Sequence, residues 1–153
     1  KNEPLTKLKR LTRFYDKIKR QEKFLKREVN SLLELICPEF EGLFDGISIR
    51  VPSVIGSIVD VTFISKKPTT VLEVNKIMTE ASHTDRWKNV FEVTSEPIVS
   101  SDIRDSAHAS IADLNFTRVV GGNLVKVLAW YDNEMGYTHT LVEHVVKMGE
   151  GLV

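Results

Sequence analysis

Apolar residues recur at alternating spacings of three and four along the first 36 residues, which predicts one amphipathic helix. No glycine or proline lies between Leu5 and Cys37, so the helix could run for about 45 Å. We interpret it as a helix packed on its own domain, with a coiled-coil seam as the alternative. The apolar stripe consists of Leu8, Leu11, Tyr15, Ile18, Leu25, Val29, Leu32 and Ile36, with one break at Glu22.

The apolar period then changes to two, which predicts β-strands bounded by glycine and proline. The clearest are Gly46–Val51 and Ser57–Ser65, and Gly121-Gly122-Asn123 has the composition of a hairpin turn between two later strands. The remaining predicted strands cover residues 87–93, 97–103, 110–112, 117–120 and 123–131.

Two more helices follow from the pattern. Thr70 and Glu73 fit a capping box that opens a helix to about Ser82, with Val71, Val74, Ile77 and Met78 on its apolar face. A final amphipathic helix is predicted from Tyr137 to Met148, with Leu141, His144, Val145 and Met148 on one side. The predicted class is α+β, a mostly antiparallel or mixed sheet with helices on one face, preceded by a long basic amphipathic helix. The domain organisation is residues 1–36 for that helix and 37–153 for the globular part.

Composition and charge narrow the function classes. The 153 residues, 42% of them apolar, suit one globular domain. The net charge is zero, but residues 1–36 carry +6 and the remainder −6. Overall neutrality argues against a nucleic-acid partner. No apolar run approaches the roughly 20 residues that span a bilayer, so a membrane partner is not expected. A start at Lys-Asn-Glu-Pro and a single cysteine, Cys37, predict a cytoplasmic protein without an internal disulfide.

Few residues suggest chemistry by themselves. Arg50 lies near the end of an apolar segment and is either a surface residue or an anion ligand. Asn133 follows an apolar run and precedes a helix, where capping is the plain interpretation. Ser100-Ser101-Asp102 suits a turn equally well. The histidines do not form a metal pair, and Cys37 is interpreted as a core residue without a catalytic partner.

Six blocks in order resemble the C-terminal catalytic domain of glyceraldehyde-3-phosphate dehydrogenase. They cover about residues 30–149 and resemble family motifs such as RVPT, SVVDLT, KPTT and WYDNE. The blocks are residues 38–52, Ser57–Thr62, residues 67–75, Thr94–Asp102, Ser110–Asp113 and Val120–Tyr137.

The resemblance implies roles for three residues. Arg50 matches the arginine of RVP, which contributes to a phosphate site. Asn133 matches the asparagine that hydrogen-bonds the carboxamide of nicotinamide, and Tyr137 matches the tyrosine beside the active site. The complete family enzyme uses NAD to oxidise and phosphorylate an aldehyde in glycolysis. NAD and NADP are not distinguished by these motifs.

The same resemblance has departures. The nucleophile segment, the catalytic histidine segment and the dinucleotide-binding domain are not recognised in these 153 residues. We therefore assign no catalytic residue and no metal ligand, and expect no NAD binding by this chain alone. The chain is interpreted as a fragment or part of the dehydrogenase, inactive alone, whose partner is a second copy or a complementary dehydrogenase chain. A phosphate-bearing small molecule is a further candidate ligand. The alternatives are a non-catalytic interaction module that reuses the fold and a truncated gene product.

Overall fold

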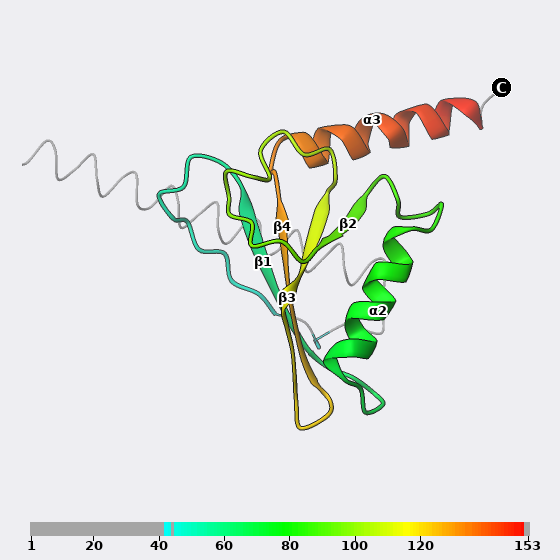
Figure 1. The fold of residues 1–153 in the computed structure, drawn as a ribbon. Coiled ribbons are helices and arrows are strands. Elements are labelled where there is room, and N and C mark those ends of the chain that lie inside the picture. The colour runs from blue at the N-terminus through cyan, green and yellow to red at the C-terminus, as the bar shows by residue number, and fades with distance from the viewer. Residues whose placement is uncertain (1–41, 44, 152–153) are drawn as a thin grey trace, which may run out of the picture. The chain divides into compact units, whose positions relative to one another are not determined.

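A computed structural model describes residues 42–43 and 45–151, and the chain divides into two compact units, Lys1–Pro52 and Ser53–Val153. The helix predicted for residues 1–36 and Cys37 lie outside the described residues. Figure 1 shows the elements of the second unit in chain colours. No helix in the described part of the chain is both long enough and apolar enough to cross a membrane.

The prediction of a strand at Gly46–Val51 is wrong. This segment has no regular secondary structure, and Ile47 and Ile49 are 80% and 77% exposed. Alternating β-branched residues make a segment suitable for a β-strand. A strand forms, however, only where a neighbouring strand supplies hydrogen bonds. Within the described residues of its own unit, no strand is available for this pairing.

The second unit is built on a four-stranded mixed sheet in the order β1-β4-β3-β2. The strands are β1 (Ser57–Ile64), β2 (Phe91–Thr94), β3 (Ser110–Val120) and β4 (Leu124–Tyr131). β4 is one of the two central strands and pairs antiparallel with both β1 and β3, whereas β2 pairs parallel with β3. The predicted α+β class with a mixed sheet is therefore confirmed.

The hairpin between β3 and β4 turns at the predicted glycines. Gly121 and Gly122 have φ values of 59° and 79°, and the turn closes with the Asn123 N–H donating to the Val120 carbonyl. Two consecutive positive φ values match the twist of a tight hairpin and favour glycine. Residues 110–112 and 117–120, predicted as separate strands, belong to the single strand β3, which has an irregularity between Asp113 and Arg118.

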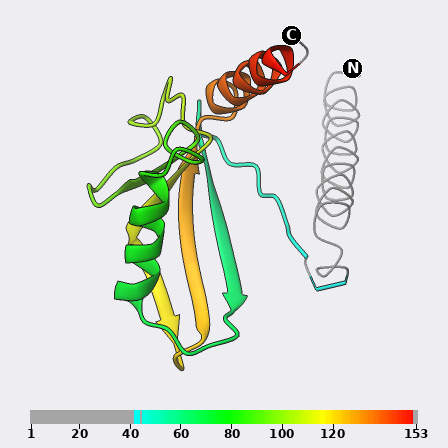
Figure 2. The ribbon, with the colours of Figure 1, turned by 90° about the vertical axis from the view of Figure 1, so that its right-hand side faces the viewer.

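The first helix of the unit, α2 (Val71–Ser82), begins where the sequence predicts, but only one half of the predicted capping box forms. The Glu73 carboxylate accepts the Thr69 hydroxyl at 2.9 Å instead of the Thr70 N–H. Thr70 is its N-cap, and its hydroxyl accepts the Glu73 N–H at 3.2 Å. The helix packs against β3 and β2 on one face of the sheet (Figure 2). Val74 and Met78 are half-buried there, but Ile77 is 58% exposed and does not belong to the packed face.

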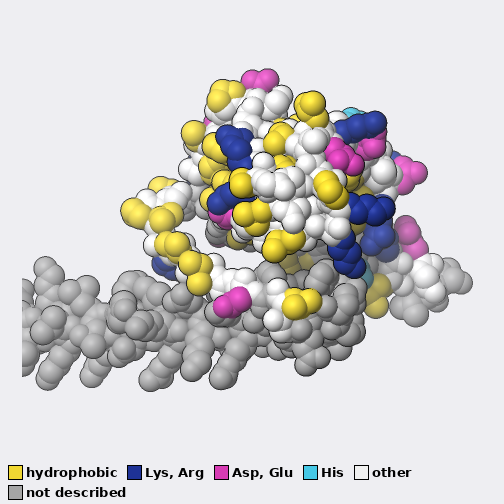
Figure 3. All heavy atoms as spheres, turned by 90° about the horizontal axis from the view of Figure 1, so that it is seen from below, with side chains coloured by type: hydrophobic (Ala, Val, Ile, Leu, Met, Phe, Trp, Pro, Cys, Tyr) yellow, Lys and Arg dark blue, Asp and Glu magenta, His cyan; other side chains and the backbone are white. Residues whose placement is uncertain are grey.

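The last helix, α3 (Met135–Glu150), continues from the end of β4 and extends beyond the sheet (Figures 1 and 2). Gly136 is its one buried residue among those described. The apolar side predicted for this helix is exposed, with Leu141 at 45% and Val145 at 60%. Figure 3 shows further hydrophobic side chains on the surface seen from below.

Two predicted strands are corrected. Residues 97–99 have no regular secondary structure, and residues 100–103 belong to a turn. In this region the Asp102 carboxylate accepts the Val99 N–H, and the Val99 carbonyl accepts the Asp102 N–H. The strand predicted for 87–93 begins only at Phe91. The preceding residues turn after α2, where the N–H groups of Trp87 and Lys88 both donate to the Thr84 carbonyl.

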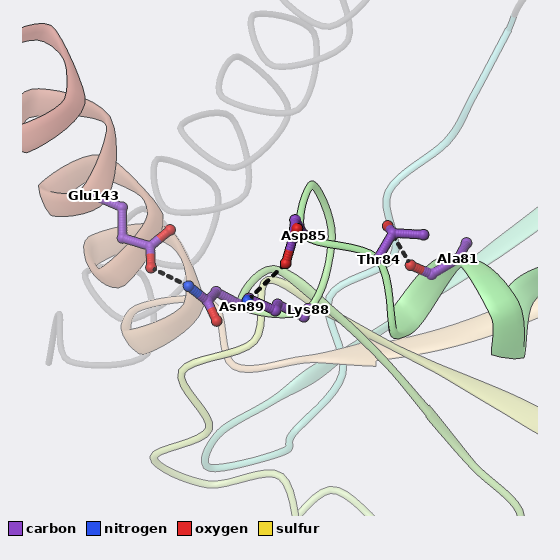
Figure 4. Close-up of polar contacts among 6 residues, drawn as sticks. All are labelled: Ala81, Thr84, Asp85, Lys88, Asn89 and Glu143. Carbon is purple, nitrogen blue, oxygen red and sulfur yellow. Dashed lines mark hydrogen bonds and ion pairs between the residues drawn. The ribbon is translucent and has the colours of Figure 1, made fainter.

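The turn after α2 is held by local side chains and also reaches α3. Thr84 donates to the Ala81 carbonyl at 2.8 Å, and Lys88 pairs with Asp85 at 2.9 Å. Asn89 Nδ2 donates to Glu143 Oε1 at 3.0 Å, so this turn contacts α3 directly (Figure 4).

The small core lies around β3, β4 and the loop before β3. Its buried apolar side chains are Ile103, Ile111, Ala112, Val125 and Ala129. β1 lies outside this core and exposes apolar side chains on both faces of the sheet, among them Ile58 at 42% and Phe63 at 46%.

Candidate functional site

The candidate site lies where β4 ends and α3 begins. Asp132, Asn133 and Glu134 separate the central strand from the first turn of the helix, so their backbone is anchored on both sides. The predicted residue Asn133 lies in this connection, and Tyr137 lies in the first turn of α3. The structure therefore brings two of the three predicted site residues to one end of the sheet.

Asp132 fixes the backbone of this connection. Its side chain is only 2% exposed, and its Oδ1 accepts the N–H groups of Glu134 and Met135, each at 2.9 Å. Its Oδ2 accepts the N–H of Asp105 at 3.0 Å. The Met135 N–H, together with those of Glu134 and Asp105, lowers the pKa of Asp132 below its ordinary value, although burial opposes this shift.

Asp132, not Asn133, therefore provides the side-chain hydrogen bonds at the start of α3. Glu134, the residue directly before the helix, makes no capping hydrogen bond with its own side chain. The plain interpretation of Asn133 as the helix cap is wrong, because the Asn133 amide points elsewhere. Its Oδ1 accepts the Ser57 hydroxyl at 2.8 Å.

Ser57 reaches Asn133 because β1 and β4 are antiparallel. Ser57, the first residue of β1, pairs with Tyr131, the last residue of β4, and Asn133 follows two residues later. Asn133 itself is exposed. Within the described residues its Nδ2 has no hydrogen-bond partner, so the amide presents two donors toward solvent.

Tyr137 is 66% exposed and follows a glycine in close contact with the loop before β3. A Cβ placed on Gly136 would lie 2.7 Å from the His108 carbonyl oxygen, closer than side-chain contacts allow. The backbone at Gly136 therefore lies directly against this loop, and Tyr137 is the next residue of the helix.

Arg50 belongs to the other compact unit, where it lies exposed in the irregular segment before Pro52. Asn133 belongs to the second unit. The joint participation of Arg50 and Asn133 in one site therefore stays a prediction.

The other candidate residues from the sequence take part in local hydrogen bonds, ion pairs or turns. Ser100-Ser101-Asp102 forms a turn, as its composition allowed. The ring nitrogens of His83 and His108 lie 2.7 Å from the Thr79 carbonyl and 3.1 Å from a Glu92 carboxylate oxygen, respectively. In the part of the chain that the structure describes, no three His, Cys, Asp or Glu side chains are grouped so that they could hold a metal ion.

Sequence reasoning missed Asp132 and Ser57. An Asp at the junction of an apolar run and a predicted helix is a capping signal, so Asp132 could have been found. Ser57 had no such signal, because its role depends on the pairing of two strands that are far apart in sequence.

The described domain is thus an α+β domain in which the Asn133 amide is exposed beside the end of β4. The family model for the glyceraldehyde 3-phosphate dehydrogenase C-terminal domain matches residues 28–133. The chain belongs to the glyceraldehyde-3-phosphate dehydrogenase family and corresponds to part of its C-terminal domain.

Individual relatives agree with this assignment. The chain is 41% identical over 118 residues to a glyceraldehyde-3-phosphate dehydrogenase of Zymomonas mobilis, and the match covers 77% of this chain and 35% of the relative. It is 43% identical over 115 residues to that of Borreliella burgdorferi, covering 74% of this chain and 34% of the relative. The chain thus spans about a third of the length of these curated relatives.

Proposed function

We propose that this chain supplies the C-terminal part of the catalytic domain of an NAD-dependent glyceraldehyde-3-phosphate dehydrogenase. In this proposal it acts in aldehyde oxidation and phosphorylation only together with the remaining two thirds of the family's sequence. These segments would be joined to it in a longer chain or supplied by a separate one. Alone, the 153 residues would neither turn over nor bind NAD.

The observation that carries the proposal is the geometry of Asn133. Its amide is exposed beside the central strand, its oxygen is engaged by Ser57, and its nitrogen is left as a donor. A donor fixed in this way suits the carbonyl oxygen of the nicotinamide carboxamide. The Asn133 side chain would then fix the plane of the ring so that a hydride is transferred in the correct geometry.

The other two residues have supporting roles. Arg50 would bind a substrate phosphate or inorganic phosphate, since a guanidinium offers several donors in a fixed plane. Tyr137 would pack beside the nicotinamide site from the first turn of α3. Nicotinamide adenine dinucleotide, when bound to the complete enzyme, accepts the hydride.

The exposed apolar side chains of α3 support the proposal that this helix contacts a partner. Exposed apolar side chains cover several sides of this helix, and contiguous apolar surface of this kind is uncommon in a monomer. We propose that the helix packs either on a complementary segment of the dehydrogenase or on a second copy of the chain, in the cytoplasm. The exposed apolar residues of the helix are Met135, Tyr137, Leu141, Val142, Val145, Val146 and Met148.

Fragment complementation tests the proposal. The chain is co-expressed with the part of the Zymomonas mobilis relative that precedes the matched region, and NADH formation from glyceraldehyde 3-phosphate, NAD and phosphate is followed. We expect turnover from the pair and none from either part alone. Asn133→Ala should then reduce kcat/KM for NAD, whereas Asn115→Ala, which removes an amide bonded to the Ser95 carbonyl, should change it little.

Two results would contradict the proposal. Turnover by the 153-residue chain alone would show that it does not depend on the other segments. A soluble, stoichiometric complex without turnover would instead favour the alternative, a non-catalytic module that uses the same surface for binding.

A further inference from the structure

The hydroxyl of Ser57 contacts the oxygen end of the Asn133 amide, and the nitrogen end is left toward solvent. Ser57 Oγ donates to Asn133 Oδ1 at 2.8 Å across 76 positions in the chain. The two residues are held together by the β1–β4 ladder, in which Ser57 pairs with Tyr131. The contact therefore joins two segments whose relative position the backbone already fixes.

The backbone of Asn133 is restrained as well. The buried carboxylate of the preceding residue, Asp132, binds the N–H groups of Glu134 and Met135, which follow Asn133. The backbone is thus fixed by Asp132 and the side-chain torsion by Ser57. Such double support is the usual way in which a polar side chain keeps a productive rotamer at an exposed site.

The chemistry of an amide gives this contact its meaning. An asparagine side chain has an acceptor oxygen at one end and two N–H donors at the other. With Oδ1 bound to Ser57, the outward end is Nδ2, which selects a carbonyl oxygen on the ligand. If the amide were reversed, Oδ1 would face outward and select a donor instead.

We infer that Ser57 is a positioning residue that orients Asn133 as a hydrogen-bond donor, so that the site favours ligands presenting a carbonyl oxygen, such as a primary carboxamide. The inference rests on the proposed function for the identity of the ligand. The orientation of Asn133 itself is a property of this chain alone, so the two can be tested separately.

The first experiment uses the isotope-labelled 153-residue chain and measures the side-chain NH₂ signals of Asn133 by NMR. We expect a heteronuclear NOE typical of an ordered amide. Ser57→Ala should reduce it to that of a freely rotating side chain, and Ser57→Thr should restore it. Ser65→Ala is the matched control, because the Ser65 hydroxyl, just beyond the other end of the strand, donates to the Lys67 carbonyl at 2.7 Å.

Two outcomes of this measurement would overturn the inference. One is an Asn133 amide that is equally ordered in Ser57→Ala, which would show that other contacts fix it. The other is an NH₂ group whose protons bond the Ser57 oxygen, which would show that the amide is reversed. A loss of the fold in Ser57→Ala would be visible in the backbone signals, and Ser57→Cys then provides a second variant of similar size with a weaker donor.

The second experiment uses the complemented enzyme. Ser57→Ala should raise KM for NAD about two- to tenfold, as expected for one hydrogen bond. KM for phosphate should change little, and Ser57→Thr should restore KM for NAD. An unchanged KM for NAD would overturn the role in ligand selection. If no active enzyme forms, the proposed function fails, while the NMR result still decides whether Ser57 orients Asn133.

Discussion

The Asp132 carboxylate binds the backbone N–H of Asp105 at 3.0 Å and thereby joins the loop before β3 to the start of α3. Asp105 has a positive φ of 64°, a left-handed conformation that is uncommon for residues other than glycine. The hydrogen bond helps to hold this residue in place. One buried side chain thus stabilises a turn in one segment and a helix start in another.

We first predict that Asp132→Ala lowers the free energy of unfolding by about 2 kcal/mol or more, because it leaves three N–H groups without their acceptor. Asp132→Asn should cost less, since one oxygen remains, although its NH₂ group would replace an acceptor. Urea unfolding followed by circular dichroism measures both. The control is Asp85→Ala, whose side chain is 99% exposed and pairs with Lys88. Equal losses for Asp132→Ala and Asp85→Ala would contradict the prediction.

A second prediction concerns acid. The backbone N–H donors hold the pKa of Asp132 below its ordinary value of 3.8, so in the folded state its carboxylate stays charged at lower pH than in the unfolded chain. Its contribution to stability is therefore complete above about pH 3.8 and is lost as pH falls through the lower folded pKa. Asp132→Asn should lose less stability than the parent chain over this range. Parallel curves of unfolding free energy against pH for the two proteins would refute it.

A third prediction uses two glycines of α3 that have opposite environments. Gly136→Ala should lower the free energy of unfolding by about 1–3 kcal/mol, because the new methyl group would meet the His108 carbonyl oxygen at 2.7 Å. A methyl group on Gly149 would meet no atom within 4 Å among the described residues outside its own stretch of helix. Gly149→Ala should therefore be neutral or stabilise the chain by up to about 1 kcal/mol. Thermal unfolding of the two variants compares them directly, and the same sign for both would count against the close contact.

Local sequence signals predicted the elements whose causes are local. The Thr70 hydroxyl caps α2, and Gly121-Gly122 makes the hairpin, because these conformations depend on a few adjacent residues. The segment Gly46–Val51 has equally strong strand composition, but a strand needs a partner, and the sequence does not specify one. The turn at Asp102 shows the reverse case, in which a side chain bonding the Val99 N–H prevails over strand propensity.

The candidate site divides in the same way. Asn133 could be singled out from the sequence because it belongs to the WYDNE motif. Asp132 could also have been found, because an Asp directly before a predicted helix is a capping signal. The Ser57 contact could not be predicted, since it requires the register that places Ser57 opposite Tyr131. Whether Arg50 joins this site depends on the placement of one compact unit against the other, which no local pattern encodes.

A last prediction concerns the buried carboxylate of Asp113, which is 1% exposed. Its Oδ2 accepts the indole N–H of Trp130 at 3.1 Å, and its Oδ1 accepts the Asn115 N–H at the same distance. Trp130→Phe removes the indole donor and leaves a buried carboxylate oxygen unpaired, which should lower the free energy of unfolding by about 1–3 kcal/mol. The other tryptophan, Trp87, is 40% exposed and is the matched control.

Trp87→Phe should cost less than Trp130→Phe, because its ring lies beneath the guanidinium of Arg86 and the phenyl ring of phenylalanine keeps most of this contact. A double-mutant cycle of Trp130→Phe with Asp113→Ala isolates the hydrogen bond, with an expected coupling of about 0.5–3 kcal/mol. Strictly additive effects would show that Trp130 stabilises the sheet by packing alone, and that another group satisfies the Asp113 carboxylate.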